Sequence, residues 1–393
     1  MRIAEIVAHH ARIPLRKTIR HASHTRDAND TLIVRCRLDD GAEGFGESLP
    51  RTYVTGETID SAFESLRRID WKESLGGDVS DLAAAIALLD EFRVPVPGDG
   101  VRDCFGNAVR CAVELAVLDA VARVEGVPLS HVTSLIPETE PIRTRPELVY
   151  YSGIVTTMSA FREYVTAWKL RGMGFRQVKV KVGVDGCDDV ACLRRVRRVL
   201  KASVDLRIDA NEAWNPDEVE AKVMPLVPFG ITSVEQPVPH EQVDRLADVR
   251  TKLGVPIMLD ESLCSRGDAQ RAIERGTCDL FNIRLSKCGG FVPSLRLAAL
   301  AHRAGLGFQL GCQVGETGIL SAAGRHFACS VGGIRYLEGC YDRYLVKERL
   351  TVEDCTFGWH GRARPLTKPG LGVEVDRTAL ARVTRREERF CVE

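Results

Sequence analysis

The chain lacks the features that mark several classes of protein. Its 54 basic residues balance 54 acidic ones, so no net charge favours nucleic acid, an anionic membrane or an acidic partner. No uninterrupted apolar stretch reaches about 18 residues, the length of a membrane-spanning helix, and the N-terminal segment has no run suited to a signal peptide. These absences predict a cytoplasmic protein that acts on a small molecule and binds neither nucleic acid nor membranes.

The 13 cysteines include no CxxC pair. Cys187 and Cys192 are the nearest two, with no histidine close to them in sequence. An odd number of scattered cysteines predicts reduced thiols and neither a zinc site nor a disulfide framework.

A chain of 393 residues with 45% hydrophobic content favours two domains. Residues 1–140 indicate an α+β domain, with an apolar opening strand, a polar loop over residues 16–30 and a hairpin at Asp40-Gly41. From Val109 onward, paired apolar residues recur at helical spacing until Gly126 and Pro128, which predicts one helix.

Residues 141–345 alternate short β-branched runs with amphipathic helical stretches. This pattern predicts a parallel sheet, either in a (β/α) barrel or in a doubly wound sheet. No GxGxxG follows the first strand, and polar residues recur at the carboxyl ends of successive strands. Both features favour the barrel.

Lys179 and Lys181 alternate with valines in the run VKVKV. Alternation places both lysines on one face of a strand. On an isolated strand that face would be solvated, but in a parallel barrel strand it points to the interior, where unpaired lysines are costly unless a site uses them.

Asp209, Glu235 and Asp260 follow one another at steps of 26 and 25 residues. A βα unit of a barrel is about 30 residues long, so the three acids are expected at the carboxyl ends of successive strands. Single acids there are often helix caps, but three that converge would repel one another. A hard ion with oxygen ligands resolves that conflict, so the sequence predicts Mg²⁺, with Mn²⁺ as the alternative.

Lys287 follows 27 residues after Asp260, at the end of the next expected strand. Counted from the strand of Lys181, it lies four strands on, which in an eight-stranded barrel is the opposite side. The arrangement predicts two lysines facing each other across the metal, suited to a planar intermediate with a base on either face.

The ordered set of segments resembles the enolase superfamily, specifically its muconate-lactonizing subgroup (mandelate racemase/muconate lactonizing enzyme-like). The segments are Lys179-x-Lys181, Asp209-Ala210-Asn211, Glu235-Gln236-Pro237, Asp260-Glu261-Ser262 and Lys287-Cys288-Gly289-Gly290, with ELAVLDAVARVEGVPL before them. The resemblance implies a (β/α)7β TIM-like barrel with a capping domain built from the N-terminal part and the C-terminal tail, residues 346–393.

The resemblance also implies roles. Lys181 and Lys287 would be the acid/base pair, and Lys179 would polarise the substrate carboxylate. Asn211 and Glu261 would position the metal ligands without binding the metal themselves. Sites of this superfamily stabilise an ene-diolate on Mg²⁺, so the mechanism is implied by the likeness. Members often form symmetric assemblies, so a homo-oligomer is expected.

Substrate choice in this subgroup depends on cap loops and the last barrel strands. The candidate loops are 21–30 and 50–57. The candidate contacts are Arg20, His24, Arg51, Tyr53, Glu316 and Glu338.

The function that these residues predict is Mg²⁺-dependent abstraction of a proton next to a carboxylate, most simply by an isomerase, either a racemase/epimerase or a cycloisomerase. A dehydrating lyase of the o-succinylbenzoate synthase kind would share the same lysines. A barrel that only binds a metal or ligand is the alternative outside catalysis, and the complete set of charged positions argues against it.

Dipeptides are expected to be poor substrates. Dipeptide epimerases carry an Asp-x-Asp on the eighth strand that holds the substrate ammonium, whereas this chain has Glu338-Gly339-Cys340. Assays with hydrophobic and acidic L,L-dipeptides should therefore show little epimerisation. Efficient turnover of any of them would contradict this interpretation of residues 336–345.

Overall fold

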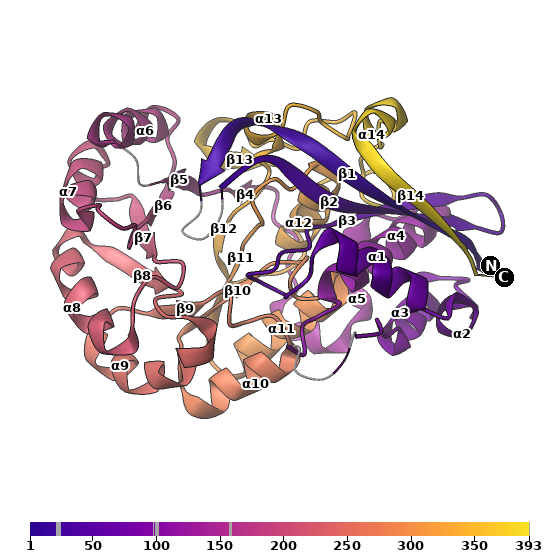
Figure 1. Ribbon diagram of the computed structural model, residues 1–393, viewed down its shortest axis with the longest axis horizontal. Helices are drawn as coiled ribbons and strands as arrows, with labels where there is room; N and C mark the ends of the chain where they lie inside the picture. The colour runs from indigo at the N-terminus through magenta and orange to yellow at the C-terminus, as the bar shows by residue number, and fades with distance from the viewer. Residues whose placement is uncertain (21–24, 97, 99–101, 157–158, 393) are drawn as a thin grey trace.

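The computed structural model describes residues 1–20, 25–96, 98, 102–156 and 159–392. A barrel of strands and helices lies beside a smaller domain of antiparallel strands and helices (Figure 1). The two ends of the chain lie together in the smaller domain, because the last strand pairs with the first (Figure 1). The helices of the described residues include none that combines the length and apolar character needed to cross a bilayer.

Eight parallel strands form the barrel, and their order in the sheet is their order in the chain. They are β5 (Gly153–Val155), β6 (Gln177–Lys181), β7 (Asp205–Asp209), β8 (Ile231–Glu235), β9 (Ile257–Leu259), β10 (Leu280–Ile283), β11 (Gly307–Leu310) and β12 (Ile334–Leu337). The amide of Ser152 donates to the carbonyl of Leu337 at 2.7 Å, so the first and last strands meet.

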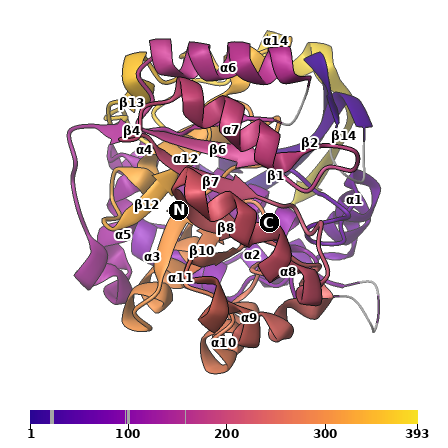
Figure 2. The same ribbon diagram turned by 90° about the vertical axis from the view of Figure 1, so that its left-hand side faces the viewer.

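A helix follows each of the first seven strands, and Figure 2 shows α7, α8 and α9 outside the strands. The helices are α6 (Ala160–Gly172), α7 (Asp189–Val199), α8 (Val219–Val223), α9 (Leu246–Leu253), α10 (Arg266–Arg275), α11 (Phe291–Arg303) and α12 (Gly318–Ala328). The predicted (β/α)7β barrel is therefore confirmed.

The smaller domain is the expected cap. Its antiparallel sheet has the order β14-β1-β2-β3. The strands are β1 (Ile3–Arg20), β2 (Thr25–Leu38), β3 (Glu43–Ser48) and β14 (Thr384–Cys391), and the helices are α1 (Ile59–Arg68), α2 (Trp71–Leu75), α3 (Leu82–Glu91), α4 (Asn107–Glu125), α5 (Val132–Leu135), α13 (Asp342–Leu345) and α14 (Arg377–Val383). A short ribbon of β4 (Val149–Tyr150) and β13 (Arg362–Ala363) joins distant parts of the chain. The boundaries at residues 140 and 345 stay predictions.

Helix α4 confirms the helix expected after Val109 and ends at the expected Gly126, whose φ is 71°. It packs on β3 so closely that a Cβ on Gly46 would lie 2.0 Å from the carbonyl oxygen of Ala112. Glycine is therefore required in β3 by the approach of the helix.

A polar loop was predicted over residues 16–30, and this prediction is wrong at both ends, where the structure has strands. β1 runs to Arg20 and β2 starts at Thr25, and these two residues pair across the ribbon. An antiparallel ribbon is stabilised by its backbone hydrogen bonds, so its side chains can stay polar. Alternation of apolar residues, the sequence signal for a strand, is therefore missing.

Two buried glutamates of the cap bind the N-termini of barrel helices. Glu114 on α4 accepts from the amides of Phe291 and Val292 at the start of α11, at 2.5 and 3.2 Å. Glu47 on β3 accepts from the amide of Thr317 before α12 at 2.8 Å. Carboxylates satisfy the unpaired amides of a helix N-terminus, so these contacts fasten the cap to the barrel.

Replacing Glu114 with Gln should change how stability depends on pH. Burial raises the pKa of Glu114 from 4.5 to about 7. The folded chain therefore binds this proton more tightly than the unfolded chain, and the stability that Glu114 contributes is present below pH 4.5 and lost as the pH rises through about 7.

The expected result is that the free energy of unfolding of the wild type falls relative to Glu114→Gln over that range, by up to about 1.4 kcal/mol per pH unit. Denaturant unfolding at a series of pH values measures it. Glu348→Gln, which removes one exposed ion pair to Arg382, is the control. Parallel pH profiles for the wild type and Glu114→Gln would contradict the assignment.

Candidate active site

Asp209, Glu235 and Asp260 lie side by side at the carboxyl ends of successive barrel strands and form what we call the acid row. Lys181, Asp209 and Glu235 end β6, β7 and β8, and the strand register pairs Lys181 with Asp209 and Asp209 with Glu235. Asp260 follows β9 directly, and the three carboxylates are at most 1% exposed. The structure thus brings together the residues that the spacing predicted.

Lys179 lies two residues before Lys181, on the same face of β6, and contacts three carboxylates. Its Nζ is 3.2 Å from Asp209, 3.3 Å from Glu235 and 2.8 Å from Glu338. Burial lowers the pKa of Lys179, but these carboxylates outweigh burial and raise it above its ordinary value. Lys179 is therefore a fixed cation.

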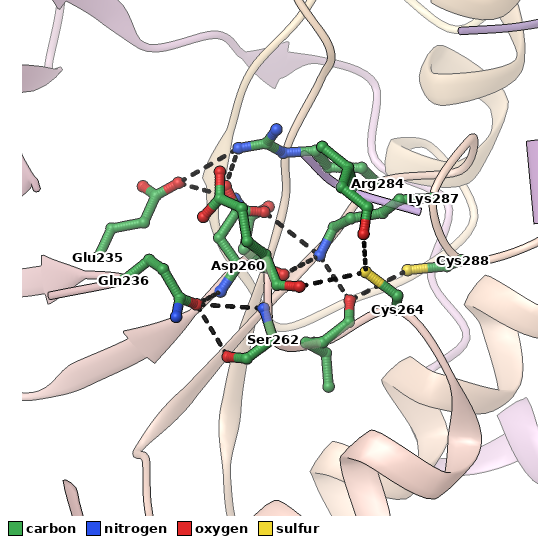
Figure 3. A network of polar contacts seen from close by, with 12 residues as sticks. Glu235, Gln236, Asp260, Ser262, Cys264, Arg284, Lys287 and Cys288 are labelled. Atoms are coloured by element: carbon green, nitrogen blue, oxygen red, sulfur yellow. Dashed lines mark hydrogen bonds and ion pairs between the residues drawn. The ribbon is translucent and has the colours of Figure 1, made fainter. Parts of the chain in front are cut away.

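Arg284, which the sequence interpretation missed, bridges the next pair of acids. Its Nη2 contacts Asp260 and lies 3.6 Å from Glu235, as Figure 3 shows. Asn282, two residues earlier, donates to Glu235 at 2.8 Å. Each neighbouring pair of carboxylates in the row therefore shares a protein cation, Lys179 for the first pair and Arg284 for the second.

The two lysines predicted to act as bases lie on opposite sides of the barrel. Lys181 is on β6 and Lys287 follows β10, four strands further on. Lys181 is partly exposed and donates to Asn211 at 2.5 Å. Lys287 is fully buried, donates to the carbonyls of Asp260 and Leu263 at 2.6 Å each, and lies 3.2 Å from the Asp260 carboxylate (Figure 3).

The turns after the strands hold unusual backbone conformations. Asn211, Gln236 and Cys340 have φ values of 45°, 36° and 57°, a region that costs non-glycine residues energy. Gln236 accepts from the amide of Asp260 at 2.8 Å and from the hydroxyl of Ser262 at 2.9 Å. The side chain of Gln236 therefore positions the loop that carries Asp260.

Glu261 is buried beside the row. Burial and the neighbouring Asp209 raise the pKa of Glu261 to about 8. One of its carboxylate oxygens accepts no hydrogen bond from any residue that the structure describes. Asn211 contacts Lys181 and Glu261 adjoins Asp260 in sequence, and their supporting role stays a prediction.

Glu338 follows β12 and is held between two cations. It accepts from Arg207 at 2.5 Å as well as contacting Lys179. Burial raises the pKa of Glu338, but Lys179 and Arg207 outweigh it and lower the pKa to about 2. Arg207 was also missed, although it lies two residues before Asp209 and hence on the same face of β7.

The other predicted substrate contacts are scattered. Partly exposed Glu316 shares with Glu338 a cavity of about 10 Å³, enough for about one water molecule. Arg51 is buried and donates to the carbonyls of Asp30 and Pro50. Tyr53 is partly exposed and packs against a small buried cluster of Val54, Cys104 and Cys264. The Arg20 side chain and His24 lie outside the described residues.

The donor set of the row fits a hard divalent ion. Asp209 Oδ2 and Asp260 Oδ1 are buried and lie 3.2 Å from the ammonium groups of Lys179 and Lys287, without a well-aligned hydrogen bond from the described part of the chain. In the same described residues, however, no three acidic, histidine or cysteine side chains are placed as ligands of one ion. We attribute this to Lys179 and Arg284, which lie between the carboxylates.

Comparison with known proteins agrees with this architecture. The profile of the family described as Enolase C-terminal domain-like matches residues 161–379. The L-Lys-D/L-Arg epimerase of Methylococcus capsulatus is 31% identical over 380 residues, which cover 95% of this chain and 99% of that protein.

Two crystal structures are similar over nearly the whole chain. That of N-succinyl Arg/Lys racemase from Bacillus cereus has a TM-score of 0.86 at 25% identity and covers 99% of this chain and all of that one. That of a dipeptide epimerase from Methylococcus capsulatus, complexed with a Mg ion, has a TM-score of 0.76 at 28% identity and covers 95% and 99%.

Fold and site together define a capped (β/α)7β barrel with opposed lysines around a row of buried acids. The chain belongs to the enolase superfamily.

Proposed function

We propose that this protein is a racemase or epimerase that removes and returns a proton next to the carboxylate of a small molecule. The observation that carries the proposal is the position of Lys181 and Lys287 on opposite sides of the acid row. Inversion at a carbon needs one group to take the proton from one face and another group to deliver a proton to the other face.

Asp209, Glu235 and Asp260 would hold Mg²⁺, with Mn²⁺ as the alternative. Their oxygens are buried, anionic and hard, and among the described residues two of them are held by lysine ion pairs of 3.2 Å without a well-aligned hydrogen bond. A bound ion would supply positive charge that stabilises the enolate form of the substrate. Because Arg284 now pairs with Asp260 and Glu235, it would have to withdraw from them.

The proton steps belong to the lysines. A neutral Lys181 would accept the proton from the carbon on its side, and the ammonium of Lys287 would deliver one from the other side; the reverse reaction exchanges these roles. Lys179 cannot share this task because its three carboxylate partners keep it charged. Its charge would instead stabilise negative charge on the substrate.

The relatives support the same reaction class. They are named as an epimerase of L-Lys-D/L-Arg and a racemase of N-succinyl Arg/Lys. The charge of Glu338 is already matched by Lys179 and Arg207. That arrangement favours a substrate without a free ammonium at this position, such as an N-acylated amino acid.

Removing the charge of any one ligand should weaken metal binding. Asp209→Asn, Glu235→Gln and Asp260→Asn should each lower Mg²⁺ affinity by more than about ten-fold and abolish turnover. Arg284→Gln should raise the affinity, because it removes the cation that competes for Asp260. Calorimetry measures both, with Glu348→Gln, a partly exposed residue that pairs with Arg382, as control. Unchanged affinity in all three ligand variants would show that the metal assignment is wrong.

Each lysine should serve one stereoisomer. Lys181→Ala should abolish deuterium exchange from one pure stereoisomer and spare part of it from the other, and Lys287→Ala should show the reverse. The measurement is NMR-detected exchange in deuterated water, with Lys252→Ala, an exposed lysine on α9, as control.

Full exchange from both stereoisomers in the double alanine variant would exclude the two-lysine mechanism. Exchange that depends on one lysine alone would indicate a cycloisomerase or a dehydrating lyase, in which the other lysine is only a cation beside the enolate.

A further inference from the structure

A second cavity lies where the cap meets α10 and α11, behind the loop that carries Lys287. Its volume is about 270 Å³. Five arginines, the carboxylates of Asp90 and Glu138, and Cys288 are among the residues that line it. These residues come from the end of α3, from α4, from a 3-10 turn after α5, and from α10 and α11.

The charges around this cavity are unbalanced, because five arginines face two carboxylates. Asp90 is already engaged by Arg296 through two hydrogen bonds of 2.6 Å. Glu138 lies 3.7 Å from the same arginine. One arginine therefore uses both carboxylates, and the other four have no acidic partner in the lining.

Among the described residues, two of those four arginines donate to backbone carbonyls alone. Arg93 donates to the carbonyl of Asp90 at 2.5 Å, and Arg110 donates to that of Leu89 at 3.2 Å. The Nε of Arg110 is buried and has no acceptor within the described residues. Buried guanidinium donors without acceptors are uncommon in folded proteins.

The side chains of the remaining two, Arg266 and Arg303, are exposed and form no hydrogen bond or ion pair with any residue that the structure describes. They extend from the first residue of α10 and the last residue of α11. Glu114 lies one helical turn after Arg110 on α4, but its carboxylate accepts hydrogen bonds from the amides of α11. Even with Glu114 included, the positive charge is in excess.

We propose that this cavity binds a small molecule with at least two anionic groups, phosphate or carboxylate. Guanidinium groups bind both in a two-pronged geometry, and they converge here from three helices and the segment just after α3. A volume of about 270 Å³ is at the small end of known ligand pockets, which matches a compact polyanion. Arg93, Arg266 and Arg303 are exposed to solvent, but they share one concave space with the partly buried Arg110.

The site is joined to the active site by short contacts. Cys288, which lines the cavity, directly follows Lys287. Asn107, one helical turn from Arg110 on α4, donates to the carbonyls of Lys287 and Cys264, both at 2.8 Å. An anion that links Arg110 to Arg266 would therefore fix the cap against the two loops that position Lys287.

Calorimetric titration of the full chain with inorganic pyrophosphate and, separately, with tricarballylate tests the site. One site per chain is expected, with affinity that falls as salt rises. The double variant Arg266→Gln/Arg303→Gln should weaken binding at least ten-fold. Arg162→Gln, an exposed arginine on α6, should leave it unchanged, and Glu138→Gln should strengthen it by removing a negative charge.

Lys181→Ala locates the binding, because the active site is also cationic. Retained affinity in Lys181→Ala together with loss in the arginine variant supports the second site, and the opposite pattern overturns it. Saturable binding of only one probe identifies phosphate or carboxylate as the ligand group. Binding of neither probe also overturns the proposal.

Discussion

The barrel depends on keeping three carboxylates side by side at its buried carboxyl end. Charges taken out of water are costly unless they are paired closely. Here Lys179 lies between Asp209 and Glu235, and Arg284 contacts both Glu235 and Asp260. Anions and cations thus alternate along the row, and the barrel can bury the row because each acid has a cation beside it.

The same constraint explains how the site is built outward. Lys287 can be buried because the backbone carbonyls of Asp260 and Leu263 accept hydrogen bonds from its ammonium group. Gln236 holds that loop from the neighbouring strand. The cap adds the last support through Glu114, which binds the start of α11 just beyond the lysine loop. Chemistry at the row therefore depends on contacts from both domains.

Much of this arrangement could be predicted from spacing. Acids at intervals of one βα unit had to fall at successive strand ends, and lysines four strands apart had to face each other. Arg284 was missed because an arginine after a strand has many ordinary roles, and only the folded row shows that it bridges two acids. The ends of the β1–β2 ribbon were missed because backbone pairing, rather than apolar side chains, stabilises them.

On the function proposed here, the acid row would exchange the Arg284 guanidinium for a divalent ion. Anomalous scattering from crystals grown with Mn²⁺ would locate that ion. We expect one strong peak in contact with Asp209, Glu235 and Asp260, and an Arg284 side chain that no longer pairs with Asp260. A row that keeps the pairing with Arg284 at saturating Mn²⁺, with no peak beside the three carboxylates, would contradict it.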